Sequence, residues 1–213
     1  VLDCGDSTCR FYRNSQGRLT LNGVVITGPE DYPSHSVLER LDIPIESLPS
    51  YRGKRVVSVG EGMGTLVDTF YGNGADVVGV DLWYGLSKFP RGYDGTKMRE
   101  FVEKWKERLI RGDSTKLPIA TESVDLYLSH GLVGNFQGEN LDKTLLESVR
   151  VIRKGGEARQ FGFAPEQLES VSQTLSERFG DTIQLEWKKI EAPLRNHWGA
   201  WGTNQYVLII RKN

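Results

Sequence analysis

The sequence contains little cysteine, methionine or histidine and no long apolar segment. Its 213 residues include 2 Cys, 2 Met and 3 His. So few cysteines exclude a disulfide-dense scaffold, which needs several cysteine pairs in a short chain. No apolar run approaches the ~20 residues that span a bilayer, and no charged, apolar and small-residue regions mark a signal peptide. We therefore expect a soluble protein with no membrane partner.

Neither sign of charge dominates the sequence. There are 27 basic and 28 acidic residues, which gives a net charge of −1. Proteins that hold nucleic acid by bulk charge carry a positive excess, so we expect no nucleic-acid partner. The hydrophobic fraction of 38% and the charged fraction of 26% are globular values that exclude disorder and a coiled coil. At ~100 to 200 residues per domain, the length predicts one domain with an extension.

Cys4 and Cys9 are the only cysteines, and they lie close together near the first residue. A C-x4-C pair is too little for a zinc site, which uses four ligands, so we expect no metal. An exported protein would join the two in a disulfide loop, whereas a cytosolic protein would keep two thiols. The sequence starts at Val1 rather than Met, and both states of the pair stay open.

Residues 1–50 differ in composition from the rest of the chain. They contain polar turn residues at 14–17, a short alternating stretch at 19–26, and prolines at 29, 33, 44 and 49. Their apolar positions are too few to close a core, which predicts a hairpin and a tethering arm. We therefore divide the chain into an N-terminal extension, residues 1–50, and one domain, residues 51–213.

From Lys54 onward, short apolar runs alternate with segments of helical periodicity, a pattern typical of a parallel sheet flanked by helices. The expected strands are residues 55–59, 75–80, 109–111, 124–128 and 158–163, and the expected helices contain residues 66–71, 98–109, 141–152 and 168–179. Lys154-Gly155-Gly156 is predicted to end the third of these helices and Gly180 the last. Residues 183–188 alternate strictly and 206–210 follow without a helix between, which predicts an antiparallel edge.

Glycines after the first of these strands indicate the chemistry. Gly60-x-Gly62-x-Gly64 lets the backbone pass beneath a nucleotide-sized ligand, and the following helix presents free N–H groups. Alone, the motif also fits a tight strand-to-helix turn. Asp81, 21 positions after Gly60, strengthens the ligand interpretation, because a carboxylate at the end of the next strand accepts both hydrogen bonds of a ribose diol. Dinucleotide and adenosyl cofactors both use this arrangement.

Spacing and downstream motifs separate these two cofactors. A dinucleotide pattern would place its third glycine or alanine at Thr65, whereas this chain has Gly64. Farther along, the sequence resembles the class I S-adenosylmethionine-dependent methyltransferases of the small-molecule type. The matching segments are residues 57–64, Val80-Asp81, Gly112 to Ile119, Glu122 to Asp125 and Arg150 to Gly156, within roughly residues 54–211. The resemblance implies an α/β fold, a Rossmann-like, seven-stranded, mostly parallel sheet with helices on both faces and an antiparallel C-terminal hairpin.

The same resemblance implies a set of cofactor-binding residues. Gly60, Gly62 and Gly64 would line the methionine and ribose, and Asp81 would hold the ribose hydroxyls. Asp113 would meet the adenine amino group, with Ser114 donating nearby. Ser129 and His130 would stand beside the methionine and the sulfonium methyl. The alternative for Asp113 is the cap of a turn. His130 is also our candidate general base, with a structural histidine as the alternative.

The glycine loop departs from the family at one position. Such proteins usually carry an acid two positions before the first glycine, where Ser58 stands here. Glu61 lies inside the loop instead, where it either faces the ammonium group of the cofactor or is exposed to solvent. This departure leaves open a degenerate protein that keeps the fold and no longer transfers methyl groups.

The acceptor is less well indicated than the cofactor. After the fourth strand, residues 129–132 lack the prolines that DNA amino-methyltransferases usually carry there. Two aromatic and basic segments, residues 82–93 and 195–202, suggest a small pocket, although each also fits a packed surface loop. The candidate acceptor residues in these segments are Trp83, Tyr84, His197 and Trp198.

The leading functional hypothesis is S-adenosylmethionine-dependent methyl transfer to the oxygen or nitrogen of a small or medium-sized acceptor. A second is a binding or regulatory protein without turnover, and a third, disfavoured by the motif spacing, is a nicotinamide-dependent oxidoreductase. Because the adenosyl cofactor is made in the cytosol, we expect a cytoplasmic protein, with an exported form as the alternative. The sequence leaves the oligomeric state open.

Overall fold

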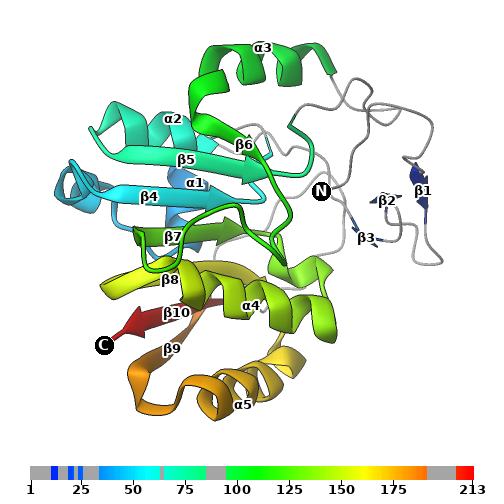
Figure 1. Ribbon diagram of the computed structural model, residues 1–213, viewed down its shortest axis with the longest axis vertical. Coiled ribbons are helices and arrows are strands. Elements are labelled where there is room, and N and C mark those ends of the chain that lie inside the picture. Colours follow the sequence, from blue (N-terminus) through cyan, green and yellow to red (C-terminus); the bar gives the residue numbers. More distant parts are fainter. Residues whose placement is uncertain are drawn as a thin grey trace.

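A seven-stranded mixed sheet forms the centre of the molecule (Figure 1). The computed structural model describes residues 11–13, 19–21, 24–25, 34–62, 65–84, 95–190 and 205–213. The strands are β4 (Arg55–Val59), β5 (Asp76–Asp81), β6 (Leu109–Arg111), β7 (Val124–His130), β8 (Ile152–Phe163), β9 (Ile183–Ile190) and β10 (Gln205–Lys212), in the order β6-β5-β4-β7-β8-β10-β9. β4 to β8 are parallel, and β10 is antiparallel to both β8 and β9. The expected fold class is confirmed.

Helices cover both faces of this sheet. They are α1 (Ser34–Arg40), α2 (Thr65–Gly72), α3 (Gly95–Trp105), α4 (Glu139–Val151) and α5 (Leu168–Phe179), with short 3-10 segments η1 (Ile45–Tyr51), η2 (Lys106–Arg108), η3 (Val133–Asn135), η4 (Pro165–Gln167) and η5 (Gly180–Thr182). Apolar side chains of α4 and α5 form one core with the sheet, and those of α1 and α2 form another on its opposite face. Figure 1 shows α4 and α5 on the near side of the sheet.

The alternation of side chains along a strand explains the sequence patterns of β9 and β10. Leu208 and Ile210 enter the core on the α4 and α5 side, whereas Val207 and Ile209 enter the core on the α1 and α2 side. All four are buried, so β10 has a continuous apolar run. β9 lies at the edge of the sheet, where its alternation of apolar and polar residues fits partial exposure.

The N-terminal extension contains a small sheet and a segment that packs on the domain. β1 (Phe11–Arg13), β2 (Leu19–Leu21) and β3 (Val24–Val25) pair antiparallel, and β2 with β3 forms the expected hairpin. α1, η1 and the turn between them contribute Val37, Leu38, Leu41, Ile43 and Leu48 to the core shared with α2. The described part of the extension from residue 34 onward therefore shares the domain core, and a boundary after residue 50 stays a prediction.

The predicted end of the third helix at Lys154 to Gly156 is wrong. α4 ends at Val151, and Lys154 and both glycines lie in β8. The pairing of β7 with β8 shifts between Val124 and Leu126, because β8 has extra residues there. Gly155 has a φ of +71°, and a Cβ on Gly156 would lie 2.9 Å from the carbonyl oxygen of Arg153. Lys154, Gly155 and Gly156 thus belong to a β-bulge. The other predicted helix end is present, because Gly180 caps α5 with a φ of +50°.

Arg150 fixes the segment that follows Asp113. Its guanidinium donates to the carbonyl oxygens of Ile119 at 2.9 Å and Leu117 at 3.1 Å. The same group pairs with Glu147, which also accepts a hydrogen bond of 2.7 Å from the backbone N–H of Leu117. Two motifs that the sequence analysis joined only by resemblance therefore contact each other, and α4 fixes the loop that leads away from Asp113.

Gly156 provides a test of the bulge. We expect Gly156→Ala to lower the free energy of unfolding by about 1 to 3 kcal/mol, because the added Cβ meets backbone atoms that cannot move aside singly. Gly72→Ala is the matched control, since a Cβ there has no atom within 4 Å, and its effect should be neutral or slightly stabilising. Urea unfolding followed by circular dichroism measures both. Equal stability of the two variants would contradict the bulge geometry.

Candidate functional site

The candidate site lies where the order of strands reverses direction. The chain passes from β4 to its neighbour β5 on one side, and later returns to pair β7 on the other side of β4. Ligands of open α/β sheets bind at such a point, beyond the carboxyl ends of the strands. In Figure 1 the arrowheads of β4, β5 and β7 point the same way. The glycine loop, Asp81, Ser129 and His130 all lie at this end.

The glycine loop turns sharply beside β7. Gly60 has a φ of +72° and donates a hydrogen bond of 2.9 Å to the carbonyl oxygen of Val80. A Cβ on Gly60 would lie 3.0 Å from the Cβ of Leu132. Gly62 also has a positive φ, +57°. Glycine is therefore required in this turn, both for its conformation and for the close approach of Leu132.

Asp81 holds this loop against the end of β5. One oxygen of its carboxylate accepts a hydrogen bond of 2.9 Å from Gly62 N–H, and the other accepts one of 2.8 Å from Trp83 N–H. The side chain is buried, and burial raises the pKa of the Asp81 carboxyl group above its usual range. Because each carboxylate oxygen has two acceptor positions, one on each stays available to a ribose hydroxyl. The geometry fits the predicted role.

Trp83 and Tyr84 are buried beside the glycine loop, and Tyr84 is hydrogen-bonded to it. The Tyr84 hydroxyl donates a hydrogen bond of 3.1 Å to the carbonyl oxygen of Gly62. Burial raises the pKa of Tyr84 well above its usual range, so the phenol stays neutral. Trp83 is also buried, with 4% of its surface exposed. These positions favour the packed alternative over a role in contacting an acceptor.

Glu61 is partly exposed, and its carboxyl group is hydrogen-bonded within the chain. Its carboxyl group turns inward, where Ser58 Oγ donates to Oε2 and the backbone N–H groups of Leu66 and Val67 donate to Oε1 at 2.7 and 3.0 Å. Burial raises the pKa of Glu61 to about 7, and the nearby charge of Asp81 adds to this effect. Glu61 therefore caps the first turn of α2 from within the glycine loop.

Asp113 and Ser114 form the turn that follows β6. Asp113 Oδ1 accepts hydrogen bonds of 2.8 Å from both the backbone N–H and the hydroxyl of Thr115. The turn-cap alternative for Asp113 is thus present, and both contacts use the same oxygen. Ser114 is buried, with its hydroxyl 3.2 Å from that of Thr144 in α4. The Ser114 side chain therefore joins the turn to α4.

Ser129 and His130 end β7 with opposite orientations. Ser129 is fully buried. The His130 ring stacks on Phe161, with ring centroids 5.3 Å apart and an interplanar angle of 11°, and its Nε2 lies 3.4 Å from Nη1 of Arg40. Burial and the positive charge of Arg40 lower the pKa of His130 to about 3. A neutral histidine whose Nε2 faces a guanidinium is a poor general base, and this geometry favours the structural alternative.

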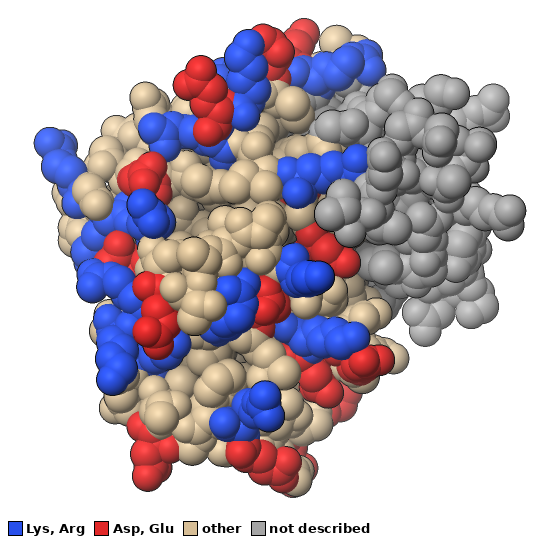
Figure 2. Space-filling view, in the orientation of Figure 1, with Lys and Arg blue, Asp and Glu red and all other residues tan. Residues whose placement is uncertain are grey.

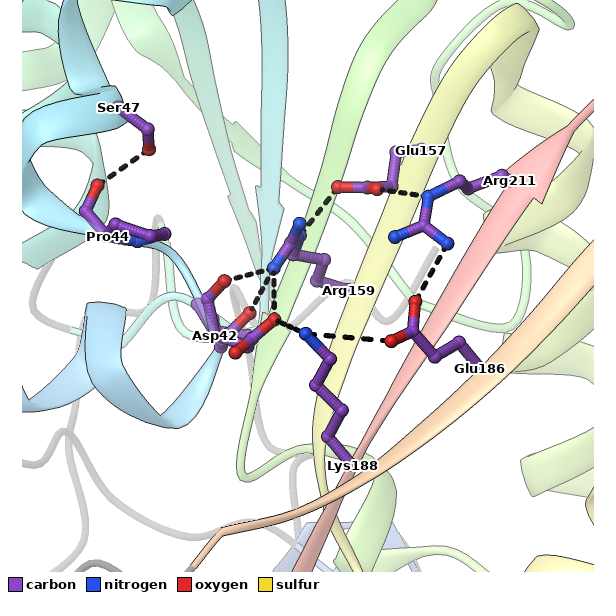
Figure 3. A network of polar contacts seen from close by, with 9 residues as sticks. Asp42, Pro44, Ser47, Glu157, Arg159, Glu186, Lys188 and Arg211 are labelled. Carbon is purple, nitrogen blue, oxygen red and sulfur yellow. Dashed lines mark hydrogen bonds and ion pairs between the residues drawn. The ribbon is translucent and has the colours of Figure 1, made fainter.

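Arg40 is a site residue that the sequence analysis missed. It ends α1, and the turn beyond it is fixed to the sheet by the network in Figure 3. There Arg159 donates to the carbonyl oxygen of Leu41 at 3.1 Å and pairs with Asp42 at 3.2 Å. Lys188 of β9 also pairs with Asp42. Arg40 and His130 are 90 positions apart, so no local pattern indicated their contact.

Several predicted residues lie outside the described part of the chain. Gly64, His197, Trp198, Cys4 and Cys9 are among them. Within the described ranges, no group of three or more His, Cys, Asp or Glu side chains is placed to hold a metal ion. No helix in those ranges is both long and apolar enough to cross a membrane.

Comparison with known proteins shows what the part of the chain that carries this site is similar to. A family model described as a methyltransferase domain matches residues 57–159, which include Gly60, Asp81 and Asp113. Residues 57–159 are therefore similar to a methyltransferase domain, and the fold is the one that class I S-adenosylmethionine-dependent methyltransferases share. A demethylmenaquinone methyltransferase of Renibacterium salmoninarum is 31% identical over 113 residues, which make up 53% of this chain and 42% of the relative. The chain therefore spans less than half the length of this curated relative.

Solved structures share the fold of this methyltransferase domain at low sequence identity. A TehB-like S-adenosylmethionine-dependent methyltransferase of Corynebacterium glutamicum has a TM-score of 0.57 at 20% identity, covering 82% of this chain and 88% of its own. A putative Zn-dependent alcohol dehydrogenase of Rhodobacter sphaeroides has a TM-score of 0.55 at 15% identity, covering 88% and 92%. Such likeness shows the fold alone.

The residues present fit S-adenosylmethionine, the cofactor of the methyltransferase family. Asp81 is buried at the carboxyl end of β5, with acceptor positions left for a ribose diol. The loop that leaves β4 has glycine at position 60, where any larger residue would contact Leu132 too closely. The sequence resemblance had indicated both features.

His130 provides a test of the proton chemistry of this candidate site. With its pKa at about 3 in the folded state, against about 6.5 unfolded, the folded protein binds fewer protons between these values. The free energy of unfolding should therefore decrease as the pH falls from 6.5 toward 3, and His130→Gln should reduce this dependence. Urea unfolding across pH measures it. Titration of the His130 ring near pH 6.5 by NMR would contradict this environment.

Proposed function

We propose that this chain catalyses methyl transfer from S-adenosylmethionine to the oxygen or nitrogen of a small or medium-sized acceptor. The observation that carries the proposal is the buried Asp81 carboxylate, held 2.9 Å from the N–H of Gly62 at the reversal point of a methyltransferase sheet. It joins the two elements that adenosyl recognition needs, a ribose acceptor and a glycine loop without side-chain obstruction.

Each residue at this end of the sheet has a defined task in the proposal. Asp81 accepts the ribose hydroxyls, the glycine loop accommodates the adjoining atoms, and Asp113 meets the adenine amino group. The bound sulfonium supplies a methyl group on a good leaving group. The protein therefore orients the acceptor nucleophile in line and excludes water. Ser129 and His130 border the place of transfer from β7.

The environment of His130 restricts the acceptors that fit. A neutral imidazole beside Arg40 is a weak proton acceptor, so the proposal favours nucleophiles that are already deprotonated or that carry a free lone pair. Neutral amines and acidic hydroxyls meet this requirement. The curated relative is named for a quinone-type substrate and methylates carbon, so quinols are included among the acceptor classes to be tested.

Surface charge supports a small acceptor over a nucleic acid. Figure 2 shows Lys and Arg side chains interspersed with Asp and Glu on the visible face of the molecule. A nucleic-acid track would present a larger positive excess. We further propose a cytoplasmic location, where the cofactor is made.

A binding protein without turnover is the second candidate, and Ser58 and the environment of His130 favour it. A nicotinamide-dependent oxidoreductase is the third. A dehydrogenase structure shares the fold, but the position of Gly64 rather than Thr65 as the third small residue argues against this candidate.

Ligand titration tests the cofactor directly. S-adenosylmethionine and S-adenosylhomocysteine should bind, and NAD should not. Asp81→Ala should weaken binding by about 1 to 3 kcal/mol, the loss expected from unpaired ribose hydrogen bonds. Asp76→Ala is the matched control, because Asp76 starts the same strand and makes only exposed ion pairs with Arg55 and Arg108 in the described chain. Titration calorimetry that shows no adenosyl binding by folded protein would refute the proposal.

Turnover separates the first two candidates. Cofactor-saturated protein should form S-adenosylhomocysteine with at least one class among phenols, carboxylates, amines and quinols. Asp81→Ala should reduce this rate by ~10-fold or more when cofactor is subsaturating, while Asp76→Ala leaves it unchanged. Mass spectrometry of the reaction measures the product. Adenosyl binding without turnover on any acceptor class would favour the binding protein.

A further inference from the structure

A carboxyl group of the chain itself occupies the N-terminus of α2. The first backbone N–H groups of a helix have no partner within the helix, and they form the usual binding place of phosphate groups. In α2, the N–H groups of Leu66 and Val67 both donate to Oε1 of Glu61, at 2.7 and 3.0 Å. Glu61 therefore stands where the phosphate of a nucleotide would otherwise bind.

Contacts from the sheet hold Glu61 in this position. Ser58 of β4 is buried, and its hydroxyl donates to the second oxygen of the Glu61 carboxyl group. A glutamate at position 61 and a small hydroxyl residue at 58 thus form one unit that links β4, the glycine loop and α2. An acidic residue at 58 would repel Glu61 rather than donate to it.

The groups around Glu61 make this end of the loop unfavourable to anions. Asp81 faces Glu61 from β5, and its carboxylate accepts from Gly62 N–H on the other side of the loop. Among the described residues, Tyr84, which follows β5, is a further titratable neighbour, and burial keeps its phenol neutral. Among the described residues, no lysine or arginine has an ion pair with either carboxylate.

We infer that Glu61 is a specificity-determining residue: it reserves the N-terminus of α2, so that the site accepts adenosyl ligands without phosphate and rejects nucleotide diphosphates. The inference rests on the proposed function, because it requires adenosyl ligands to bind at this end of the sheet. A sulfonium ligand is cationic at its reacting centre and carries no phosphate, so the two carboxylates do not repel it. A pyrophosphate would have to displace Glu61 and would face its charge.

Acid should weaken this rejection. Burial raises the pKa of Glu61 to about 7, so the group is mostly ionised at pH 8 and mostly protonated at pH 6. Protonation removes the repulsion of a nearby anion and leaves an oxygen that still accepts hydrogen bonds. Rejection of phosphate should therefore be stronger at pH 8 than at pH 6. A role limited to packing would show no such dependence.

ADP-ribose is the probe for the experiment, because its two phosphates do not titrate between pH 6 and 8. At pH 8, wild-type protein should bind it weakly or not at all, and Glu61→Ala should bind it at least ~10-fold more tightly. Glu61→Gln, which keeps the shape and removes the charge, should lie between them. The wild-type affinity should improve from pH 8 to pH 6, while that of Glu61→Gln stays constant. Titration calorimetry measures each affinity.

Two controls separate this effect from general damage. Glu139→Ala removes an exposed glutamate from the first turn of α4, where it pairs with Lys143, and should leave every affinity unchanged. Adenosine, which has no phosphate, should bind the wild type and both Glu61 variants within about threefold of one another.

The inference is overturned if folded Glu61→Ala and Glu61→Gln bind ADP-ribose no better than the wild type at pH 8. Glu61→Gln alone decides the matter if the alanine variant does not fold. Failure of the wild type to bind S-adenosylhomocysteine would refute the proposed function instead, and the comparison with ADP-ribose distinguishes the two failures.

Discussion

The carboxylate of Asp81 is the interaction on which the rest of the site depends. It lies at the end of β5 and accepts one hydrogen bond from the glycine loop after β4 and one from the turn after β5. The segments that follow β4 and β5 are thereby joined beyond the last pair of the ladder. Without this acceptor, the N–H groups of Gly62 and Trp83 would lose the carboxylate, and the loop would be held beside β5 only by the hydrogen bonds of Gly60 to Val80 and of Tyr84 to Gly62.

The cost of burying charge explains why so many backbone donors converge at this end. Burial raises the pKa of both Asp81 and Glu61, which means that the protein destabilises their ionised forms. Four backbone N–H groups and the Ser58 hydroxyl offset this cost, two for Asp81 and three for Glu61. Sites that bind ligands commonly keep such strained electrostatics, since the best partner of the carboxylate is the ligand.

Local patterns predicted the fold and indicated part of the candidate site. Strand and helix periods indicated the sheet, and the positions of Gly60 and Asp81 followed from motifs within one β-α-β unit. Lys154 to Gly156 was misinterpreted because cations and glycines suit a helix end and a β-bulge equally. The contact of Arg40 with His130 joins residues 90 positions apart and depends on packing of α1, which no local pattern reveals.

The environments of His130 and Glu61 leave neither side chain suited to proton transfer. Arg40 and burial hold His130 neutral across the physiological range, so β7 offers the acceptor little help in losing a proton. Glu61 is poised to change charge near neutral pH, but its carboxyl group is committed to Ser58 and α2. The described residues thus supply position and shape at the candidate site more than proton transfer. The proposed reaction therefore requires an acceptor that is already nucleophilic and a cofactor that is already activated, which is the division of work that a sulfonium methyl donor permits.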